Sequence, residues 1–309
     1  RTSLDVSARG IADLTGIGGF TTLRTLNCQN NRLTQLPTLP GTLTTLLCDV
    51  NQITTLPALP EGLNALSCNY NQLAFLPVLP NELQAITCNN NQLVQLPTLP
   101  KTLMALSCTN NLLTALPELP EKLQLLFCTD NKITQLPALP DGLTTVYCHD
   151  NPISCLPYLP NSLSVLYIDT DKVGCLPNTV PELKVYNVRG NLVDNFPVCV
   201  FIQDPKFAEA IRSNCPSCIG ICNNLTPNAA LHTTLYVNSK GISSLSGIEN
   251  FTSLQRLDCS YNALIKLPLN LPETLTFLNC SNNPLTELKQ LSNQLTELNC
   301  SYCHIKIIE

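Results

Sequence analysis

The chain has 309 residues, which is enough for between one and three ordinary domains. Only 13% of the residues are charged, the formal net charge is -5 and no cluster of lysine and arginine occurs, so nothing predicts binding to nucleic acid. No apolar run reaches the roughly 18 residues that cross a bilayer, which argues against a membrane span. Hydrophobic residues make up 44% and aromatic residues 5%, as expected for a core of small aliphatic side chains.

A 20-residue repeat occupies the first part of the chain, with the form LxxLxCxxNxLxxLPxLPxx in nine consecutive units. Three residue types recur at fixed places in each unit. The columns are leucine from Leu23 to Leu183, asparagine from Asn31 to Asn191 with Asp171 in one unit, and cysteine from Cys28 to Cys148, continued by Ile168 and Val188.

Each part of the unit has a physical reading. The stretch xLxCx alternates, which predicts a short strand with leucine and cysteine pointing inward. The asparagine side chain can bond to backbone groups of the next turn, so stacked asparagines form a ladder. The LPxLP stretch, such as residues 36–40, predicts an extended, polyproline-like convex side, because proline fixes φ and has no N–H donor. Each unit buries its leucines against its neighbours, which predicts a solenoid.

This pattern resembles the leucine-rich-repeat family. The 20-residue form LPxLPxxLxxLxxxxNxL is similar to the shortest bacterial class, known from type III secreted effectors. The resemblance implies short parallel strands on a concave face and a function in binding. The chain departs from that class by placing cysteine where valine or leucine is usual, and it lacks the ubiquitin-ligase domain that some effectors carry.

A second array begins late in the chain. Residues 1–37 and 232–268 align without gaps and are identical at 17 of 37 positions, and both segments open an array. We therefore expect a first array over 1–200, a junction over 201–231 and the start of a second array over 232–309. Because Arg1 and Glu309 both fall inside patterned segments, the sequence predicts a fragment of a longer protein with several arrays.

The junction predicts a short capping helix near residues 204–213. Asp204 is a good N-cap and Pro205 suits the first helical turn. Phe207, Ala210 and Ile211 fall on one face, which would cover the exposed end of the second array. This cap, with the GIxxLxGIxxF opening, resembles surface leucine-rich-repeat proteins exported by type IX secretion and, to a lesser degree, internalins. The resemblance implies a secreted or cell-surface location.

The 17 cysteines fall into two groups. Ten continue the ladder column and are expected to be small buried apolar side chains, without a metal or redox role. Cys155 and Cys175 hold equivalent places in adjacent units and lie within possible disulfide range. At the junction, two disulfides or a four-thiolate zinc site are both open, and the absence of a second CxxC favours disulfides. The junction cysteines are Cys199, Cys215, Cys218 and Cys222.

Catalysis is not expected. The chain has three histidines and none of the motifs HExxH, GxSxG, GxGxxG or the P-loop. The acidic residues are scattered and converge on no site. We therefore predict a protein that is not an enzyme and needs no cofactor or resident metal.

The concave face changes character after about residue 124. Residues between the inward positions form three outward columns, which on a strict 20-residue count end at Val185, Asn187 and Arg189. An aromatic stripe with a polar rim is typical of an interface, although stacking that only stabilises the sheet remains open. The predicted binding residues are Leu125, Phe127, Tyr147, His149, Val165, Tyr167, Asp169 and Arg189.

The sequence thus predicts a non-catalytic binding or adhesion module of a secreted or cell-surface bacterial protein, with a protein or glycan ligand on the concave face. One alternative is a structural subunit of a cell-surface assembly that contacts other copies or domains of the same protein. Another is a translocated effector that binds host proteins. A leucine-rich-repeat fold alone predicts binding but not the partner.

Overall fold

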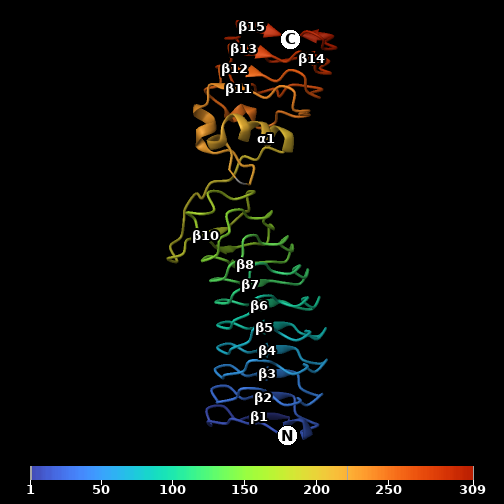
Figure 1. The fold of residues 1–309 in the computed structure, drawn as a ribbon, viewed down its shortest axis with the longest axis vertical. Helices are drawn as coiled ribbons and strands as arrows, with labels where there is room; N and C mark the ends of the chain where they lie inside the picture. The colour runs from blue at the N-terminus through green and yellow to red at the C-terminus, as the bar shows by residue number, and fades with distance from the viewer. Residues whose placement is uncertain (1, 221, 309) are drawn as a thin grey trace. The chain divides into compact units, whose positions relative to one another are not determined.

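The computed structural model describes residues 2–220 and 222–308 and divides into two compact units, Arg1–Val198 and Cys199–Glu309. Unit 1 contains a single sheet of 10 parallel strands, stacked in chain order (Figure 1). The strands are β1 Ser3–Asp5, β2 Thr25–Asn27, β3 Thr45–Leu47, β4 Ala65–Ser67, β5 Ala85–Thr87, β6 Ala105–Ser107, β7 Leu125–Phe127, β8 Thr145–Tyr147, β9 Val165–Tyr167 and β10 Lys184–Tyr186.

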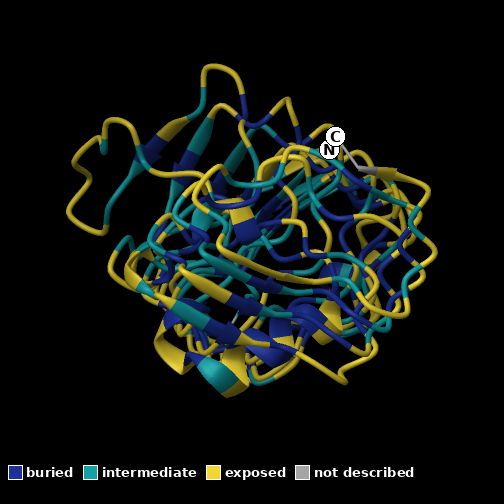
Figure 2. Cartoon of the chain, turned by 90° about the horizontal axis from the view of Figure 1, so that it is seen from above, coloured by how far each residue is buried: buried dark blue, intermediate teal, exposed yellow. Residues whose placement is uncertain are grey.

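The inward leucines and cysteines explain why each strand forms where it does. Leu26 pairs with Leu46 on the next strand, and both side chains are fully buried. Cys28 and Cys48 follow two residues later and are equally buried. Figure 2, viewed along the stack, shows buried residues inside the coil and exposed ones on its outer turns. The predicted solenoid is confirmed.

The return segments carry no helix in unit 1 except the 3-10 turn η1 at Ile17–Gly19, as far as the described residues go. Leu36 and Leu39 of the first LPxLP stretch are buried at 6% exposure, and the prolines that follow them have no N–H group to leave unpaired. The extended convex side is therefore as predicted.

The asparagine ladder satisfies the backbone at each turn. The Asn51 side-chain amide donates to the carbonyls of Cys28 at 3.0 Å and Cys48 at 3.1 Å, and its oxygen accepts from the Leu33 N–H at 3.0 Å. Each asparagine therefore ties two successive units together. The same pattern recurs in unit 2 at Asn283.

The residue before each ladder asparagine has a positive φ, which is the left-handed region that asparagine, aspartate and glycine tolerate best. Asn90 has φ 55° and Asp130 also has φ 55°. At the same place in their units stand Val50 with φ 54° and Tyr70 with φ 53°. A β-branched side chain in this region is strained, so Val50 is a local cost to stability.

Val50→Asn is expected to stabilise the chain by about 1 kcal/mol, because asparagine adopts the left-handed region more easily than valine. The measurement is the urea unfolding midpoint at unchanged slope. Val94→Asn is the matched control, since Val94 is similarly exposed, 43% against 47% for Val50, and has no positive φ. A Val50→Asn variant no more stable than Val94→Asn would argue against strain at this turn.

The last unit of the first array is one residue shorter than the unit before it. Val165 of β9 pairs with Lys184 of β10 and Tyr167 pairs with Tyr186, a step one residue shorter than the step from β8 to β9. The unbroken 20-residue count is therefore wrong here, and the predicted outward positions of Val185 and Asn187 are wrong with it. Val185 points inward and is 4% exposed. Because side chains alternate along a strand, Val185 enters the core while its neighbours Lys184 and Tyr186 face outward.

Unit 2 contains the helix α1, Pro205–Asn214, and a sheet of four parallel strands in the order β11-β12-β13-β15. Phe207 and Ile211 of α1 are fully buried in one cluster with Leu235 of β11, so the helix covers the first turn of this array. No helix among the described residues is long and apolar enough to cross a membrane. The remaining bounds are η2 Pro216–Cys218, η3 Pro227–Leu231, β11 Thr234–Tyr236, η4 Ile248–Asn250, β12 Arg256–Asp258, β13 Phe277–Asn279, β14 Glu287–Leu288, β15 Glu297–Asn299 and β16 Ile307–Ile308.

Asp204 joins α1 to the array through both carboxylate oxygens. One oxygen caps the helix, accepting from the N–H groups of Lys206 at 2.9 Å and Phe207 at 3.1 Å. The other accepts from the N–H groups of Ser243 at 2.8 Å and Ser244 at 3.0 Å. Burial alone would raise the pKa of Asp204, but these hydrogen bonds outweigh it and hold the pKa below its usual value.

This lowered pKa gives unit 2 a stability that depends on pH. A carboxyl with a depressed folded pKa contributes fully above its unfolded pKa of about 3.9 and loses the contribution as pH falls through the folded pKa. Asp204→Asn should cost about 2 kcal/mol at pH 7, because its NH₂ group would face the donors of Ser243 and Ser244. Helical circular dichroism during urea unfolding measures this loss. A loss that stayed the same down to pH 2 would contradict the assignment.

Candidate functional site

A ladder of four aromatic rings crosses the concave face of β7 to β10. Phe127 and Tyr147 meet edge to face with ring centroids 4.9 Å apart. Tyr147 and Tyr167 follow at 4.2 Å, and Tyr167 and Tyr186 stack in nearly parallel planes at 4.5 Å. Each ring is the last residue of its strand, so the parallel register places the four side by side. We call these four residues the aromatic ladder.

Tyr186 was missed by the sequence prediction because the count of 20 placed Asn187 in this column. The available signal was the alternation of residues 184–187, where Val185 is the residue suited to the core. The correction lengthens the aromatic ladder by one strand. Partial burial, and then the neighbouring Tyr167, raise the pKa of the Tyr147 phenol above its usual value.

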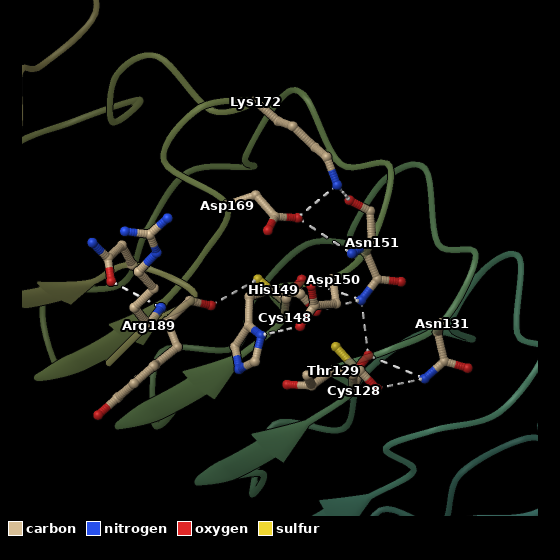
Figure 3. Close-up of polar contacts among 12 residues, drawn as sticks. Cys128, Thr129, Asn131, Cys148, His149, Asp150, Asn151, Asp169, Lys172 and Arg189 are labelled. Atoms are coloured by element: carbon tan, nitrogen blue, oxygen red, sulfur yellow. Dashed lines mark hydrogen bonds and ion pairs between the residues drawn. The ribbon is translucent and has the colours of Figure 1, made fainter. Parts of the chain in front are cut away.

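Charged groups lie beside the aromatic ladder, where the ring centroids of His149 and Tyr167 are 6.1 Å apart. Figure 3 shows the polar contacts of these charged groups. Nδ1 of His149 is 2.7 Å from a carboxylate oxygen of Asp150. Beyond it, Lys172 Nζ lies 2.9 Å from a carboxylate oxygen of Asp169 and donates to the Asn151 carbonyl at 2.9 Å. Asp169 is only 11% exposed, while Lys172 is 49% exposed and presents its charge to solvent. This edge offers both signs of charge within a short span.

The structure brings most of the predicted residues together. Leu125, at 36% exposure, and the half-buried Val165 lie at the starts of β7 and β9, on the opposite side of the aromatic ladder from His149. Arg189 is different: the shorter last unit moves it off the third column into the exposed turn after β10. There its N–H donates to the Asn187 side chain at 2.9 Å. The expectation that Arg189 continues the column of His149 and Asp169 is therefore wrong.

The concave face of β2 to β6 has a different chemistry that the sequence analysis did not identify. Asp49 accepts from the Ser67 hydroxyl at 2.7 Å and from the Asn69 N–H at 2.6 Å. Ser67 and Thr87 hydroxyls are 2.9 Å apart, and the network continues to Asn89. These polar groups largely satisfy one another across the strands. The aromatic ladder instead presents the exposed parts of four half-buried rings, an apolar strip beside polar groups.

The buried ladder cysteines are expected to be unreactive. Burial raises the pKa of the Cys28 and Cys88 thiols to about 12, and it raises that of Cys108 well above the usual value. Reactive thiols need a lowered pKa and access to solvent, and these have neither. Such thiols act as small apolar core residues.

The remaining cysteines up to Cys222 are oxidised. Cys215 and Cys218 form a disulfide whose Cα atoms are 5.3 Å apart. The other four with disulfide bonds are Cys155, Cys175, Cys199 and Cys222. A disulfide sulfur is not a thiolate, so in this state the four junction cysteines do not make the four-thiolate zinc site that the sequence left open.

Comparison with known proteins places the chain among bacterial repeat proteins. No family model matches it, and no curated protein does. The leucine-rich effector YopM from Yersinia pestis matches over 100% of this chain and 80% of its own, at 28% identity and a TM-score of 0.51. YopM from Yersinia enterocolitica matches over 94% at 28% identity and a TM-score of 0.47, and this chain spans 62% of its length.

Two further structures are similar. A Shigella effector leucine-rich-repeat domain is 32% identical over 50% of this chain and 71% of its own, with a TM-score of 0.46. The functional domain of InlJ from Listeria monocytogenes, which includes a cysteine ladder, is 22% identical over 98% of this chain and 68% of its own, with a TM-score of 0.38.

The stacked parallel strands, the asparagine ladder and the extended convex side define a leucine-rich-repeat solenoid. The chain belongs to the leucine-rich-repeat family, in its bacterial form with 20-residue repeats.

Proposed function

We propose that the chain is a non-catalytic protein-binding module whose ligand lies on the aromatic ladder of the concave face. The observation that carries this proposal is the run of four contacting rings from Phe127 to Tyr186 with a charged edge. Tyrosine supplies large contact area at low conformational cost, and interfaces centre on such residues within a polar rim. This arrangement supports a role in binding.

The edge of the site favours a protein ligand over a glycan. A glycan would use the ring faces and neutral hydrogen bonds, and gains little from the adjacent charges. The exposed side chains of Asp150 and Lys172 instead complement the basic and acidic side chains of a protein surface. Contact with a second copy of the chain is the structural-subunit alternative, and the mass of the purified protein in solution tests it.

The proposed setting is outside the cytosol of the bacterium. Disulfides persist in oxidising compartments, and the chain has six bonded cysteines: Cys155, Cys175, Cys199, Cys215, Cys218 and Cys222. This favours a secreted or cell-surface protein over an effector that acts in the reducing cytosol of a host, although YopM and the Shigella domain are effectors. Alkylation of the unreduced, denatured protein from its native source tests this: eleven free thiols are expected, from the free cysteines of the structure, whereas 17 would favour the effector.

The binding proposal is tested with a peptide-display library and a glycan array, both screened with the full chain. Tyr147→Ala should weaken the recovered peptides at least about tenfold, as for an interface hot spot. Tyr158→Ala is the control, because Tyr158 is 71% exposed and lies outside the concave strands. Glycan binding that is lost in Tyr147→Ala would mean that the ligand is a glycan and not a protein. Equal losses of binding in Tyr147→Ala and Tyr158→Ala would contradict a site on the aromatic ladder.

A further inference from the structure

Three side chains of unit 2 bring metal-ligand atoms together next to α1. The sulfurs of Cys215 and Cys218 and a ring nitrogen of His232 all lie within 4.8 Å of one another. Cys218 is fully buried, Cys215 is 7% exposed and His232 is half-buried. Tetrahedral zinc with Zn–S near 2.3 Å and Zn–N near 2.0 Å needs ligand atoms about 3.5–3.8 Å apart. The three groups therefore need only small shifts to surround one ion once the sulfurs separate.

The sequence spacing agrees with this geometry. Cys215-x2-Cys218-x13-His232 matches the first three ligands of the C-x2-C-x12–15-H zinc pattern. In that pattern a second histidine would follow after three to five intervening residues, where Tyr236, Val237 and Asn238 stand. The set thus has three protein ligands and leaves one coordination position for water.

The surroundings favour a cation over thiol–disulfide exchange. An exchanging thiol typically sits at a helix N-terminus, where its pKa is lowered. Cys215 instead follows the last turn of α1, with its N–H donating to the Ile211 carbonyl at 2.7 Å. The negative end of the helix dipole lies there, which disfavours a bare thiolate and favours a positive ion.

We propose that Cys215, Cys218 and His232 form a redox-gated site for a thiophilic divalent cation such as Zn²⁺. In the oxidised chain the sulfurs are bonded to each other and the site is closed. A dithiol reductant supplies two electrons and two protons, the S–S bond breaks, and the reductant leaves as its own disulfide. The metal then displaces the two thiol protons into solvent, and an unprotonated ring nitrogen of His232 coordinates the metal through its lone pair. This proposal stands independently of the binding function.

Cobalt provides the probe for this site. Co²⁺ is titrated into the full chain, reduced with a phosphine and freed of metal, and thiolate-to-cobalt charge-transfer absorption is recorded. One Co²⁺ per chain is expected to bind with this absorption and to be displaced by Zn²⁺, whereas the oxidised chain should show none. Cys215→Ser with Cys218→Ser should abolish the absorption, even though reduction also frees Cys199 and Cys222.

His232→Ala leaves Cys215 and Cys218 in place, so it tests the site in a chain that can still form their disulfide. It should weaken Co²⁺ binding at least about tenfold and shift the ligand-field bands. His304→Ala is the matched control, because His304 is exposed and lies outside the cluster. Absence of charge transfer in the reduced chain, its survival in the double serine variant, or equal binding by the two histidine variants would each overturn the proposal.

Discussion

Val146→Asp is expected to destabilise unit 1 by more than about 4 kcal/mol, the range of a buried unpaired charge. Val146 is fully buried, and its strand neighbours Leu126 and Leu166 lie in the same core column. Every residue of that column is apolar, so no cation compensates a carboxylate there. Hydrogen exchange measured by mass spectrometry on peptides of unit 1 would show loss of protection across neighbouring units, because each unit is covered by the next.

Tyr147, the residue next to Val146, provides the comparison for Val146→Asp. Tyr147 points to the opposite face of the same strand, so Tyr147→Ala should cost only about 1 kcal/mol through lost ring contacts. Val146→Ala should cost about 2 kcal/mol, which separates the effect of a cavity from that of a charge. Equal losses of protection in Val146→Asp and Tyr147→Ala would contradict the assignment of the two faces.

The sequence predicted the solenoid because its stabilising contacts repeat. The residue types of Leu26, Cys28 and Asn31 recur at fixed places in most units. The leucines and cysteines pack in one core with their equivalents, and the asparagines bond to backbone groups of their own and the adjacent unit. Strand position, inward faces and the extended convex side follow from one unit and its neighbours. The capping helix was equally local, since Asp204 and Pro205 mark its start.

Features that break the repeat were not predictable in the same way. The leucine column continues at Leu183 although β10 begins one residue early, so the shift was hidden and Tyr186 was missed. The ion pair of Asp169 and Lys172 depends on the path of an irregular turn. The approach of His232 to Cys215 depends on how the chain returns through η3, which no period encodes.

The asparagine ladder gives the second large effect: Asn111→Leu is expected to cost about 3 kcal/mol, through lost bonds and a stranded donor. The Asn111 amide donates to the carbonyls of Cys88 at 3.1 Å and Cys108 at 3.0 Å, and its oxygen accepts from the buried Leu93 N–H at 3.0 Å. Each of these carbonyls keeps a second asparagine donor, Asn91 or Asn131, in the variant. The Leu93 N–H loses its partner, and an unsatisfied buried donor costs about 1–3 kcal/mol beyond the lost bonds.

Leucine is a stringent replacement, because Asn111 is only 6% exposed and leucine adds apolar surface there. A loss of stability in Asn111→Leu therefore cannot come from a loss of buried apolar surface. Gln92→Leu makes the same change from amide to leucine at an exposed position, directly after the ladder asparagine Asn91 of the preceding unit, and should alter stability by less than about 0.5 kcal/mol. Urea unfolding of the two variants measures the difference. A loss in Asn111→Leu no larger than in Gln92→Leu would mean that leucine packing alone holds the units together. The expected difference would instead make the ladder asparagine the residue that fixes each turn.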